Sequence, residues 1–371
     1  MKTFQTRLEK MWDWMAQENI ALIMFEDCEE RRDENIRWLT GQPGDALLFL
    51  SVDRKTALVP WDINMAKAYA RADLIIPYND FERSPIKAVN GIAAKLKIPA
   101  GSKIEIPPGT PYPVFLNYVG ELTSFDIICR ERSAVSQARE FRAVKDEDEI
   151  KIYRKAADIT NAITALLEKN VRSGKIKTES DAALFIENES RRRGCEGTGF
   201  ETLAAGPERS FGIHAFPSWT DAAFGGQGLS ILDFGVRLGG YTTDITLTFI
   251  RDPCPQQEKM AALVEKAHKT ALSMAAPGTE TFAIAAEVDA LFLKAKKRMP
   301  HALGHGIGLE EHEYPAIRNF TGNKWSLLPG MVFTIEPGLY DPVYGGCRLE
   351  NDFLMGESGP EQLTGARIIR L

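Results

Sequence analysis

The sequence predicts a protein of two domains, an α/β domain followed by an α+β domain. Three observations support this prediction. The chain has 371 residues, and such a length favours more than one domain. Short apolar runs alternate with helical patterns over the first third of the chain. In the remainder, the order helix, helix, hairpin occurs twice. We therefore expect an α/β domain over residues 1–135 and an α+β domain over residues 136–371.

The composition is that of a globular protein with little charge bias. Hydrophobic residues make up 44%, charged residues make up 26%, and the net charge is -6. A mildly acidic chain is poorly suited to bind nucleic acid. No apolar run approaches the roughly 18 residues of a membrane-spanning helix. No Cys-x-x-Cys pair occurs among the five cysteines. We therefore expect reduced thiols in a cytoplasmic protein, with no nucleic-acid or membrane partner.

The first domain begins with an amphipathic helix. Its apolar positions repeat at helical spacing: Phe4, Leu8, Met11, Trp12 and Met15. Strands are expected at residues 20–25, 46–52, 56–60, 103–106 and 124–129, and helices at 64–72 and 84–96. Alternation of this kind is typical of an α/β domain.

The first half of the second domain begins after a stretch, 133–143, that we expect to be a linker. The acidic run that begins at Asp146 favours the first turn of a helix, which is expected to end at Gly174. Thr178 and Asp181 have the spacing of a capping box and predict a second helix that ends at Gly194. A hairpin is expected over residues 229–250.

The second half repeats this order with little residue identity. Helices are expected over residues 256–275 and 282–298, a strand over 301–309, and a hairpin over 331–354. The second domain is therefore predicted to consist of two helix-helix-hairpin halves related by a pseudo-twofold axis.

All five histidines lie between residues 214 and 312. Three of them belong to one run, 301–312, in which glycines alternate at 304, 306 and 308. Each glycine would cost about 1 kcal/mol inside a helix, so a strand is favoured. Its glycine face predicts the close approach of a ligand or of another backbone. Histidines of the core or of a loop remain the alternative, but the clustering favours a metal site, because histidine is a common metal ligand.

The first hairpin carries two aspartates. A two-residue turn at Gly239 and Gly240 pairs Asp233 with Thr246, which places Asp244 on the same face of the sheet. The two aspartates are then diagonal neighbours about 7–8 Å apart at the backbone. A three-residue turn would instead place them on opposite faces.

Two acids on one face among apolar residues require a counter-charge, because buried carboxylates are costly. No lysine occurs between Lys177 and Lys259 to supply it, whereas a divalent cation would. The alternative is that both aspartates face solvent on an edge strand.

The second hairpin adds two glutamates and an arginine. Glu336 ends an apolar run, and Arg348 and Glu350 are two residues apart, as on one face of a strand. With His305, the four carboxylates make a set of oxygen and nitrogen ligands without sulfur. Such a set suits a pair of divalent ions such as Mn²⁺, Co²⁺ or Zn²⁺ better than a structural zinc site.

In order and spacing, these motifs resemble the pita-bread metallopeptidases, which include Xaa-Pro dipeptidase (prolidase) and Xaa-Pro aminopeptidase. The segment from Asn35 to Gly41 is similar to the N-terminal domain of the creatinase/prolidase group. The resemblance implies hydrolysis of the Xaa-Pro bond at the N-terminus of dipeptides or short peptides by a metal-activated hydroxide. It also implies two divalent ions per subunit, with Mn²⁺ expected first, and a homodimer.

The resemblance also assigns roles to residues. The implied metal ligands are Asp233, Asp244, His305, Glu336 and Glu350. The implied catalytic residues are His214, His301, His312, Glu336 and Arg348. Glu336 would take and return a proton, and His214 and His312 would donate hydrogen bonds to the substrate. Arg348 would brace the carboxylates, and His301 would flank the ligand His305.

The roles of three further residues do not follow from the motifs of the family. His268 has no counterpart in the family and is expected on the surface of a helix. Tyr340 and Phe216 are candidates for the pocket that accepts the proline ring.

Three alternatives remain: a metal-free creatinase-type hydrolase that cleaves C–N bonds in small molecules, a metal-dependent relative with a non-peptide substrate, and a non-catalytic binding module. The metal-free hydrolases and the binding modules lose metal ligands, so the complete set here favours a peptidase. Dipeptidase and aminopeptidase are not separated. A dipeptidase needs a cation for the carboxylate of its substrate, and Arg318 could supply it, although a surface arginine is favoured.

Overall fold

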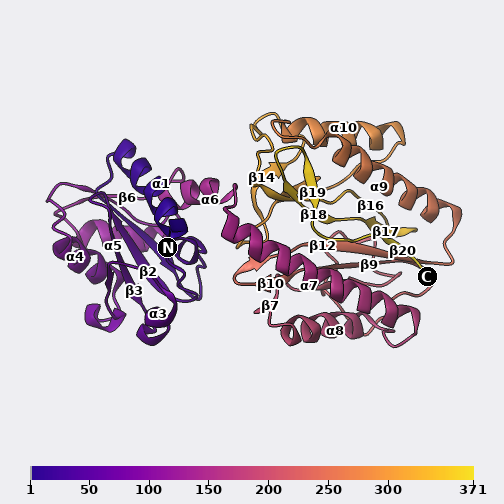
Figure 1. The fold of residues 1–371 in the computed structure, drawn as a ribbon, viewed down its shortest axis with the longest axis horizontal. Coiled ribbons are helices and arrows are strands. Elements are labelled where there is room, and N and C mark those ends of the chain that lie inside the picture. Colours follow the sequence, from indigo (N-terminus) through magenta and orange to yellow (C-terminus); the bar gives the residue numbers. More distant parts are fainter. Residues whose placement is uncertain (1) are drawn as a thin grey trace. The chain divides into compact units, whose positions relative to one another are not determined.

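The computed structural model describes residues 2–371 and divides into two compact units, Met1–Phe141 and Arg142–Leu371. The division lies six residues beyond the boundary predicted from the sequence. Figure 1 shows the elements of each unit. Within residues 2–371, no helix combines the length and apolar character needed to span a membrane.

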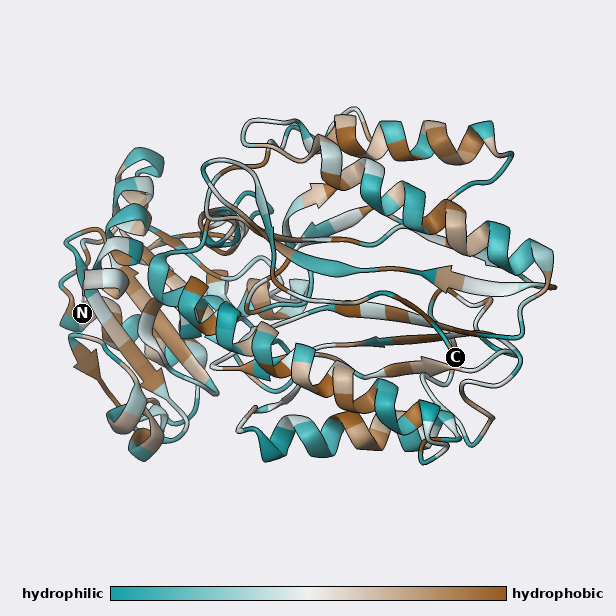
Figure 2. Ribbon diagram, turned by 45° about the vertical axis from the view of Figure 1, so that its right-hand side comes forward, coloured by the Kyte–Doolittle hydropathy of each residue, from teal (hydrophilic) through white to brown (hydrophobic). Residues whose placement is uncertain are grey.

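The first unit is a mixed six-stranded sheet with helices packed on it, in the strand order β4-β3-β2-β1-β5-β6. Its strands are β1 (Leu22–Asp27), β2 (Ala46–Ser51), β3 (Lys55–Pro60), β4 (Leu74–Ile75), β5 (Lys103–Glu105) and β6 (Asp126–Ile128). Its helices are α1 (Lys2–Glu18), α2 (Asn35–Thr40), α3 (Ile63–Tyr69), η1 (Tyr78–Phe81), α4 (Pro85–Lys95), α5 (Tyr112–Glu121) and α6 (Ala134–Arg142). Every residue of β2 is buried, and Figure 2 shows the central strands as predominantly hydrophobic. The α/β prediction is confirmed.

The prediction of a linker over residues 133–143 is wrong, because α6 occupies this stretch. The backbone N–H of Ala134 donates to Oε1 of Glu105 at 2.5 Å, which satisfies a donor of the first helical turn. Ala134 and Ala138, four residues apart, are both buried and anchor one face of the helix. The buried face of α6 consists of small alanines among polar residues, so the sequence shows no clear apolar stripe there.

The second unit contains four long helices. They are α7 (Glu147–Arg172), α8 (Glu179–Arg192), α9 (Pro255–Met274) and α10 (Thr281–Lys294). The predicted capping box is present at the start of α8, between Thr178 and Asp181, and the structure adds one that was not predicted at the start of α7, between Asp146 and Glu149. These caps explain why the first two helices begin where the sequence indicates.

The strands of the second unit form the two predicted hairpins and their neighbours. Those of the first half are β7 (Gly197–Thr198), β8 (Leu203–Ala205), β9 (Gly228–Phe234), β10 (Val236–Leu238), β11 (Tyr241–Thr242) and β12 (Ile245–Arg251). Those of the second half are β13 (Gly304–Gly306), β14 (Glu313–Ile317), β15 (Val332–Ile335), β16 (Gly338–Asp341), β17 (Gly345–Arg348), β18 (Asn351–Met355), β19 (Pro360–Gln362) and β20 (Ile368–Arg370).

The two halves share one core. Figures 1 and 2 show α7 and α8 along one side of the strands and α9 and α10 along the other. A single cluster of buried apolar side chains includes residues of all four helices and both hairpins. The predicted α+β domain with two helix-helix-hairpin halves is confirmed.

The register of the first hairpin is also confirmed. Leu238 pairs with Tyr241 across the two-residue turn, and Asp233 pairs with Thr246. Both turn glycines have positive φ, +58° and +88°, as this tight turn requires. Asp233 and Asp244 therefore lie on the same face of the hairpin.

The strand predicted over residues 301–309 is shorter, because only β13 (Gly304–Gly306) is regular and a bulge follows His305. The glycines make room for neighbouring backbone. A Cβ on Gly304 would lie 2.1 Å from the carbonyl oxygen of Thr334, and one on Gly306 would lie 1.9 Å from that of Tyr314. Close approach of another backbone, one of the two expected causes, accounts for both glycines.

The prediction that His268 lies on a helix surface is wrong. Its relative exposure is 7%, and its ring lies 5.9 Å from that of Phe353. Burial lowers the pKa of His268 to about 4, so the ring is neutral near pH 7. His268 is four residues from the buried Val264 and three from the buried Ala271, a spacing that places it on the core face of α9.

Candidate metal centre

A cavity of about 610 Å³ in the second unit brings the predicted site residues together. All of them line it: His214, Asp233, Asp244, His301, His305, His312, Glu336, Arg348 and Glu350. They come from both hairpins, from β13 and from the segments beside them. Residues that are separated by more than 130 positions along the chain therefore share one site.

The backbone of the two hairpins places the carboxylates. Asp233 lies on β9 and Asp244 directly precedes β12, while Glu336 directly follows β15. An isolated bridge joins Thr246 of β12 to Glu350, and the Glu350 N–H donates to the Thr246 carbonyl at 3.2 Å. The Thr246 hydroxyl also donates to Oε2 of Glu350 at 2.8 Å. Thr246 of the first hairpin thus holds Glu350 of the second hairpin in position.

His305 presents an unprotonated nitrogen to the acids. Its Nδ1 lies 3.0 Å from the carbonyl oxygen of Gly306, which accepts a hydrogen bond and so assigns the proton to Nδ1. Its Nε2 lies 3.7 Å from Oδ2 of Asp244 and 3.6 Å from Oε1 of Glu336. Burial, and then the nearby His312, lower the pKa of His305 to about 3. A neutral nitrogen lone pair that faces carboxylate oxygens is the arrangement of a metal ligand.

The carboxylates are buried without enough positive charge. Burial and the charges of Glu350 and Asp233 raise the pKa of Asp244 well above its usual value. Burial and the charge of Glu350 do the same for Glu336. Burial and Asp233 raise the pKa of Glu350 to about 7, against the opposing effect of Arg348. The acids would ionise together at neutral pH only beside a compensating cation.

Unpartnered oxygen atoms show where such a cation fits. Oδ1 of Asp233, Oδ1 of Asp244 and Oε1 of Glu350 are buried and accept no hydrogen bond from the described residues. Ligand atoms of Asp244, His305 and Glu350 lie within 4.8 Å of one another. Buried acceptors of this kind are normally satisfied. A donor set of carboxylate oxygens and imidazole nitrogen therefore fits divalent metal ions.

Arg348 and Tyr340 brace one wall of the site. Nη2 of Arg348 donates to Oδ2 of Asp233 at 2.6 Å, and Nη1 donates to the Tyr340 hydroxyl at 2.7 Å. The Tyr340 hydroxyl lies 3.1 Å from Nε2 of His301, whose Nδ1 lies 2.8 Å from the Ala302 carbonyl. Both ring nitrogens of His301 are therefore engaged by the protein. His301 also packs beside Glu336, with Nδ1 3.6 Å from Oε2.

A buried glutamate holds the segment that carries His214. Glu179, at the start of α8, is fully buried. Its carboxylate accepts hydrogen bonds from the Gly206 N–H at 2.7 Å and from the Thr220 N–H at 2.8 Å. It also pairs with Arg209 at 3.0 Å. Both ends of the segment from Gly206 to Thr220 are thus tied to one side chain.

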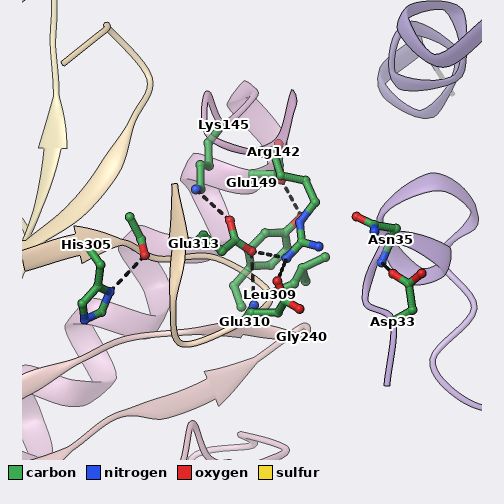
Figure 3. A network of polar contacts seen from close by, with 12 residues as sticks. Asp33, Asn35, Arg142, Lys145, Glu149, Gly240, His305, Leu309, Glu310 and Glu313 are labelled. Atoms are coloured by element: carbon green, nitrogen blue, oxygen red, sulfur yellow. Dashed lines mark hydrogen bonds and ion pairs between the residues drawn. The ribbon is translucent and has the colours of Figure 1, made fainter. Parts of the chain in front are cut away.

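A second buried glutamate holds the segment that carries His312. Figure 3 shows Arg142 and Lys145 pointing toward the carboxylate of Glu313. Arg142 donates to Oε1, and Nζ of Lys145 lies 3.2 Å from Oε2. The three side chains are 1%, 1% and 2% exposed. The adjacent His312 is 68% exposed, and its ring centroid lies 4.4 Å from that of His305.

Three residues that help to build the site were not identified as site residues from the sequence. Thr246, Glu179 and Glu313 act through hydrogen bonds and ion pairs with partners that are distant in the chain. The proposed proline-pocket residues are not placed as expected. Phe216 is 95% exposed, Tyr340 is partly buried and bound by Arg348, and neither is among the residues that line the cavity. By contrast Arg318, for which a surface role was favoured, lines the cavity while remaining exposed.

Comparison with known proteins assigns both parts of the chain. Residues 151–357 match the model of metallopeptidase family M24. Residues 7–102 match the model of the creatinase/prolidase N-terminal domain. The first match covers more than half of the chain, and together the two follow the order of the two units.

Individual relatives agree with the family models. The chain is 28% identical over 373 residues to an Xaa-Pro dipeptidase of Pyrococcus horikoshii, and the aligned region covers 98% of each protein. It is 34% identical to an Xaa-Pro dipeptidase of Pyrococcus furiosus over 61% of this chain and 64% of that protein. The crystal structure of the Pyrococcus horikoshii prolidase has the same fold, with a TM-score of 0.84, 23% identity and coverage of 98% and 99%. The protein thus belongs to metallopeptidase family M24 and carries a creatinase/prolidase N-terminal domain.

Proposed function

We propose that this protein hydrolyses the Xaa-Pro bond at the N-terminus of dipeptides or short peptides with the help of two divalent metal ions. The observation that carries the proposal is the position of His305. Its unprotonated Nε2 faces the carboxylates of Asp244 and Glu336 at 3.7 and 3.6 Å, in a cavity that contains three unpartnered carboxylate oxygens.

Five side chains would hold the ions: Asp233, Asp244, His305, Glu336 and Glu350. Four carboxylates balance the charge of two divalent ions, and none of the ligands is a thiolate. When bound, the ions would lower the pKa of water and polarise the substrate carbonyl. Mn²⁺ is our first expectation because the donors are mainly oxygen, and Co²⁺ and Zn²⁺ also suit the set.

The protein's own groups would move the proton and hold the substrate. Glu336 lies between His305 and His301 and would accept a proton at its carboxylate, then return it to the proline nitrogen. His214 and His312 line the same cavity and would donate to the oxygen of the cleaved carbonyl group. Because Arg348 already pairs with Asp233, its role would be to position that ligand.

The cavity also suits the proline ring. Its volume of about 610 Å³ accommodates a dipeptide. The apolar part of the lining is formed by Phe200, Leu203, Ile213, Ala215, Ala302 and Ala316. A ring nitrogen without a hydrogen needs no acceptor at this point. An apolar wall therefore favours proline over residues whose amide N–H must be satisfied.

Metal analysis and peptide hydrolysis test the proposal together. We expect the purified protein to bind about two divalent ions per chain and to cleave Ala-Pro but not Ala-Ala. A strong chelator should abolish cleavage, and Mn²⁺ should restore it. Activity that persists after removal of all metal would instead favour a metal-free hydrolase, and absence of both metal and hydrolysis would favour a binding module.

We further propose that the protein is a cytoplasmic homodimer. The unpaired state of all five cysteines is consistent with a reducing compartment. The family resemblance supports the dimer. Light scattering of the purified protein tests it, and a mass of about 41 kDa, that of one chain, would contradict it.

A further inference from the structure

Two side chains of the second hairpin bind the backbone of two proposed metal ligands. The Asp244 N–H donates to Oδ2 of Asp352 at 3.1 Å, and the His305 N–H donates to the Thr334 hydroxyl at 3.3 Å. Both acceptor side chains are fully buried. A hydrogen bond to the main chain of a ligand residue fixes the point from which its side chain extends. The two acceptors are therefore placed to orient ligands of the metal centre.

Thr334 on β15 and Asp352 on β18 belong to one face of the sheet. They lie directly opposite each other in the antiparallel register, so their side chains are neighbours. Glu350 is two residues before Asp352, and its side chain extends from the same face. Ligand atoms of Glu350, Asp244 and His305 lie within 4.8 Å of one another. One cross-strand pair is thus linked to all three residues of this group.

The chain around Asp244 shows why this ligand needs an acceptor from another hairpin. Thr243 and Asp244 lie between β11 and β12, outside the regular strands. Here the Thr243 carbonyl approaches Gly235 so closely that a Cβ on Gly235 would lie 1.6 Å from its oxygen. Asp244 is 6% exposed, and a buried N–H without an acceptor is costly. Asp352 supplies the acceptor and thereby holds the irregular segment from which Asp244 reaches the cavity.

The stability of the fold alone does not explain Asp352. Its carboxylate is fully buried, and Oδ1 accepts no hydrogen bond from residues 2–371. Nor does any arginine or lysine of the described chain form an ion pair with it. A buried carboxylate of this kind is less favourable than an apolar side chain of similar volume. Its hydrogen bond with the Asp244 N–H therefore indicates a role in the metal centre.

We propose that Thr334 and Asp352 are positioning residues that hold the backbone of His305 and Asp244, so that these ligands and Glu350 converge on one divalent ion. This inference rests on the metal site of the proposed function and adds the groups that arrange it before the ion binds. Ligands held in this way lose little conformational freedom on binding. Loss of such a support typically lowers metal affinity by about 10–100-fold.

The first test measures the affinity of the chelator-treated full chain for Mn²⁺ by calorimetry. T334V removes the hydroxyl but keeps the shape of the side chain, so it should weaken the binding of one ion by about tenfold or more. T334S keeps the hydroxyl and should bind as the wild type does. The matched control is T164V, because the buried Thr164 hydroxyl donates to the Thr160 carbonyl within α7 and does not line the cavity. Equal affinities of T334V and T164V would overturn the role of Thr334.

Two variants of Asp352 separate positioning from charge in the same assay. D352N keeps an acceptor for the Asp244 N–H but removes the negative charge, whereas D352L removes both. D352N should stay within about threefold of the wild-type affinity, and D352L should lose about tenfold or more. A loss in D352N as large as that in D352L would mean that Asp352 acts through its charge, which overturns its positioning role.

A third measurement uses only the wild type, so it decides the matter even if D352L does not fold. In the metal-free protein, hydrogen–deuterium exchange at the amides of Asp244 and His305 should be as slow as in β12 and β15. Rapid exchange at either amide overturns the proposal. None of these tests requires peptide cleavage. A wild type that binds Mn²⁺ but does not cleave Ala-Pro would refute the proposed function alone, and one that binds no Mn²⁺ would refute both.

Discussion

Replacement of Glu313 by glutamine should destabilise the second unit strongly. The Glu313 carboxylate is 2% exposed and lies between the buried cations Arg142 and Lys145. The substitution keeps the shape of the side chain but removes its charge. Two buried cations then lose their main counter-charge. Removing one partner of a buried ion pair is strongly destabilising, because it leaves an uncompensated charge inside the protein.

The lowered pKa of Glu313 gives the size of the expected loss of stability. Burial raises this pKa, but the charges of Arg142 and Lys145 and the hydrogen bonds of Arg142 and Glu310 lower it more, to about 2 from 4.5. A decrease of this size corresponds to about 3 kcal/mol of stabilisation of the ionised form. We therefore expect the E313Q variant to lose about 3 kcal/mol at pH 7.

The pH dependence has a definite sign. Because the folded-state pKa is lower than the unfolded value, the contribution of Glu313 is complete above about pH 4.5. It is lost as the pH falls toward about 2 and the folded carboxylate takes up a proton. The difference in stability between wild type and E313Q should therefore be constant from pH 7 to 5 and should shrink below pH 4.5.

Hydrogen–deuterium exchange of the β13 and β14 amides measures this stability within the second unit alone. The control is E361Q, because Glu361 pairs with Arg154 at the surface, where the side chains are 43% and 50% exposed. Such a pair contributes about 1 kcal/mol or less. A loss below 1 kcal/mol in E313Q, or a loss that does not change between pH 7 and 3.5, would refute the reasoning.

Three further substitutions test the site. D233N should lower the bound metal at least tenfold in elemental analysis while the fold is retained; a full metal content would remove Asp233 from the ligand set. H312A should keep its metal and lower kcat by about 10²–10³, the typical effect of one lost donor to the reacting oxygen; loss of the metal would instead make His312 a ligand. E179Q should increase hydrogen exchange in the segment that carries His214 and lower kcat without loss of metal, and unchanged exchange would contradict its role as an anchor.

The sequence predicted those features that depend on local chemistry. Two adjacent glycines defined the turn of the first hairpin, and the turn alone set the register that brings Asp233 and Asp244 to one face. The capping box of Thr178 and Asp181 likewise marked the start of α8. In each case the interacting groups are a few residues apart, so the pattern is visible in the chain.

The features that were missed depend on distant partners. Glu313 is 171 residues from Arg142, and no local pattern links the two. The start of α6 is satisfied by Glu105, 29 residues earlier, so its N-terminus resembled a loop. His268 was misplaced for a related reason, since its burial depends on Phe353 and on the packing of α9 against the second hairpin.

Under the proposed ligand assignment, the division of the acids between the two hairpins links metal binding to the packing of the two halves. The first hairpin supplies Asp233 and Asp244, and the second supplies Glu336 and Glu350. Neither half contains the full set, and the contact of Thr246 with Glu350 is what aligns them. An ion held by both hairpins binds only the packed state and therefore stabilises the interface between the halves. The same acids repel one another across that interface when no cation lies between them, so the stability of the second unit and its metal affinity are two measures of one equilibrium.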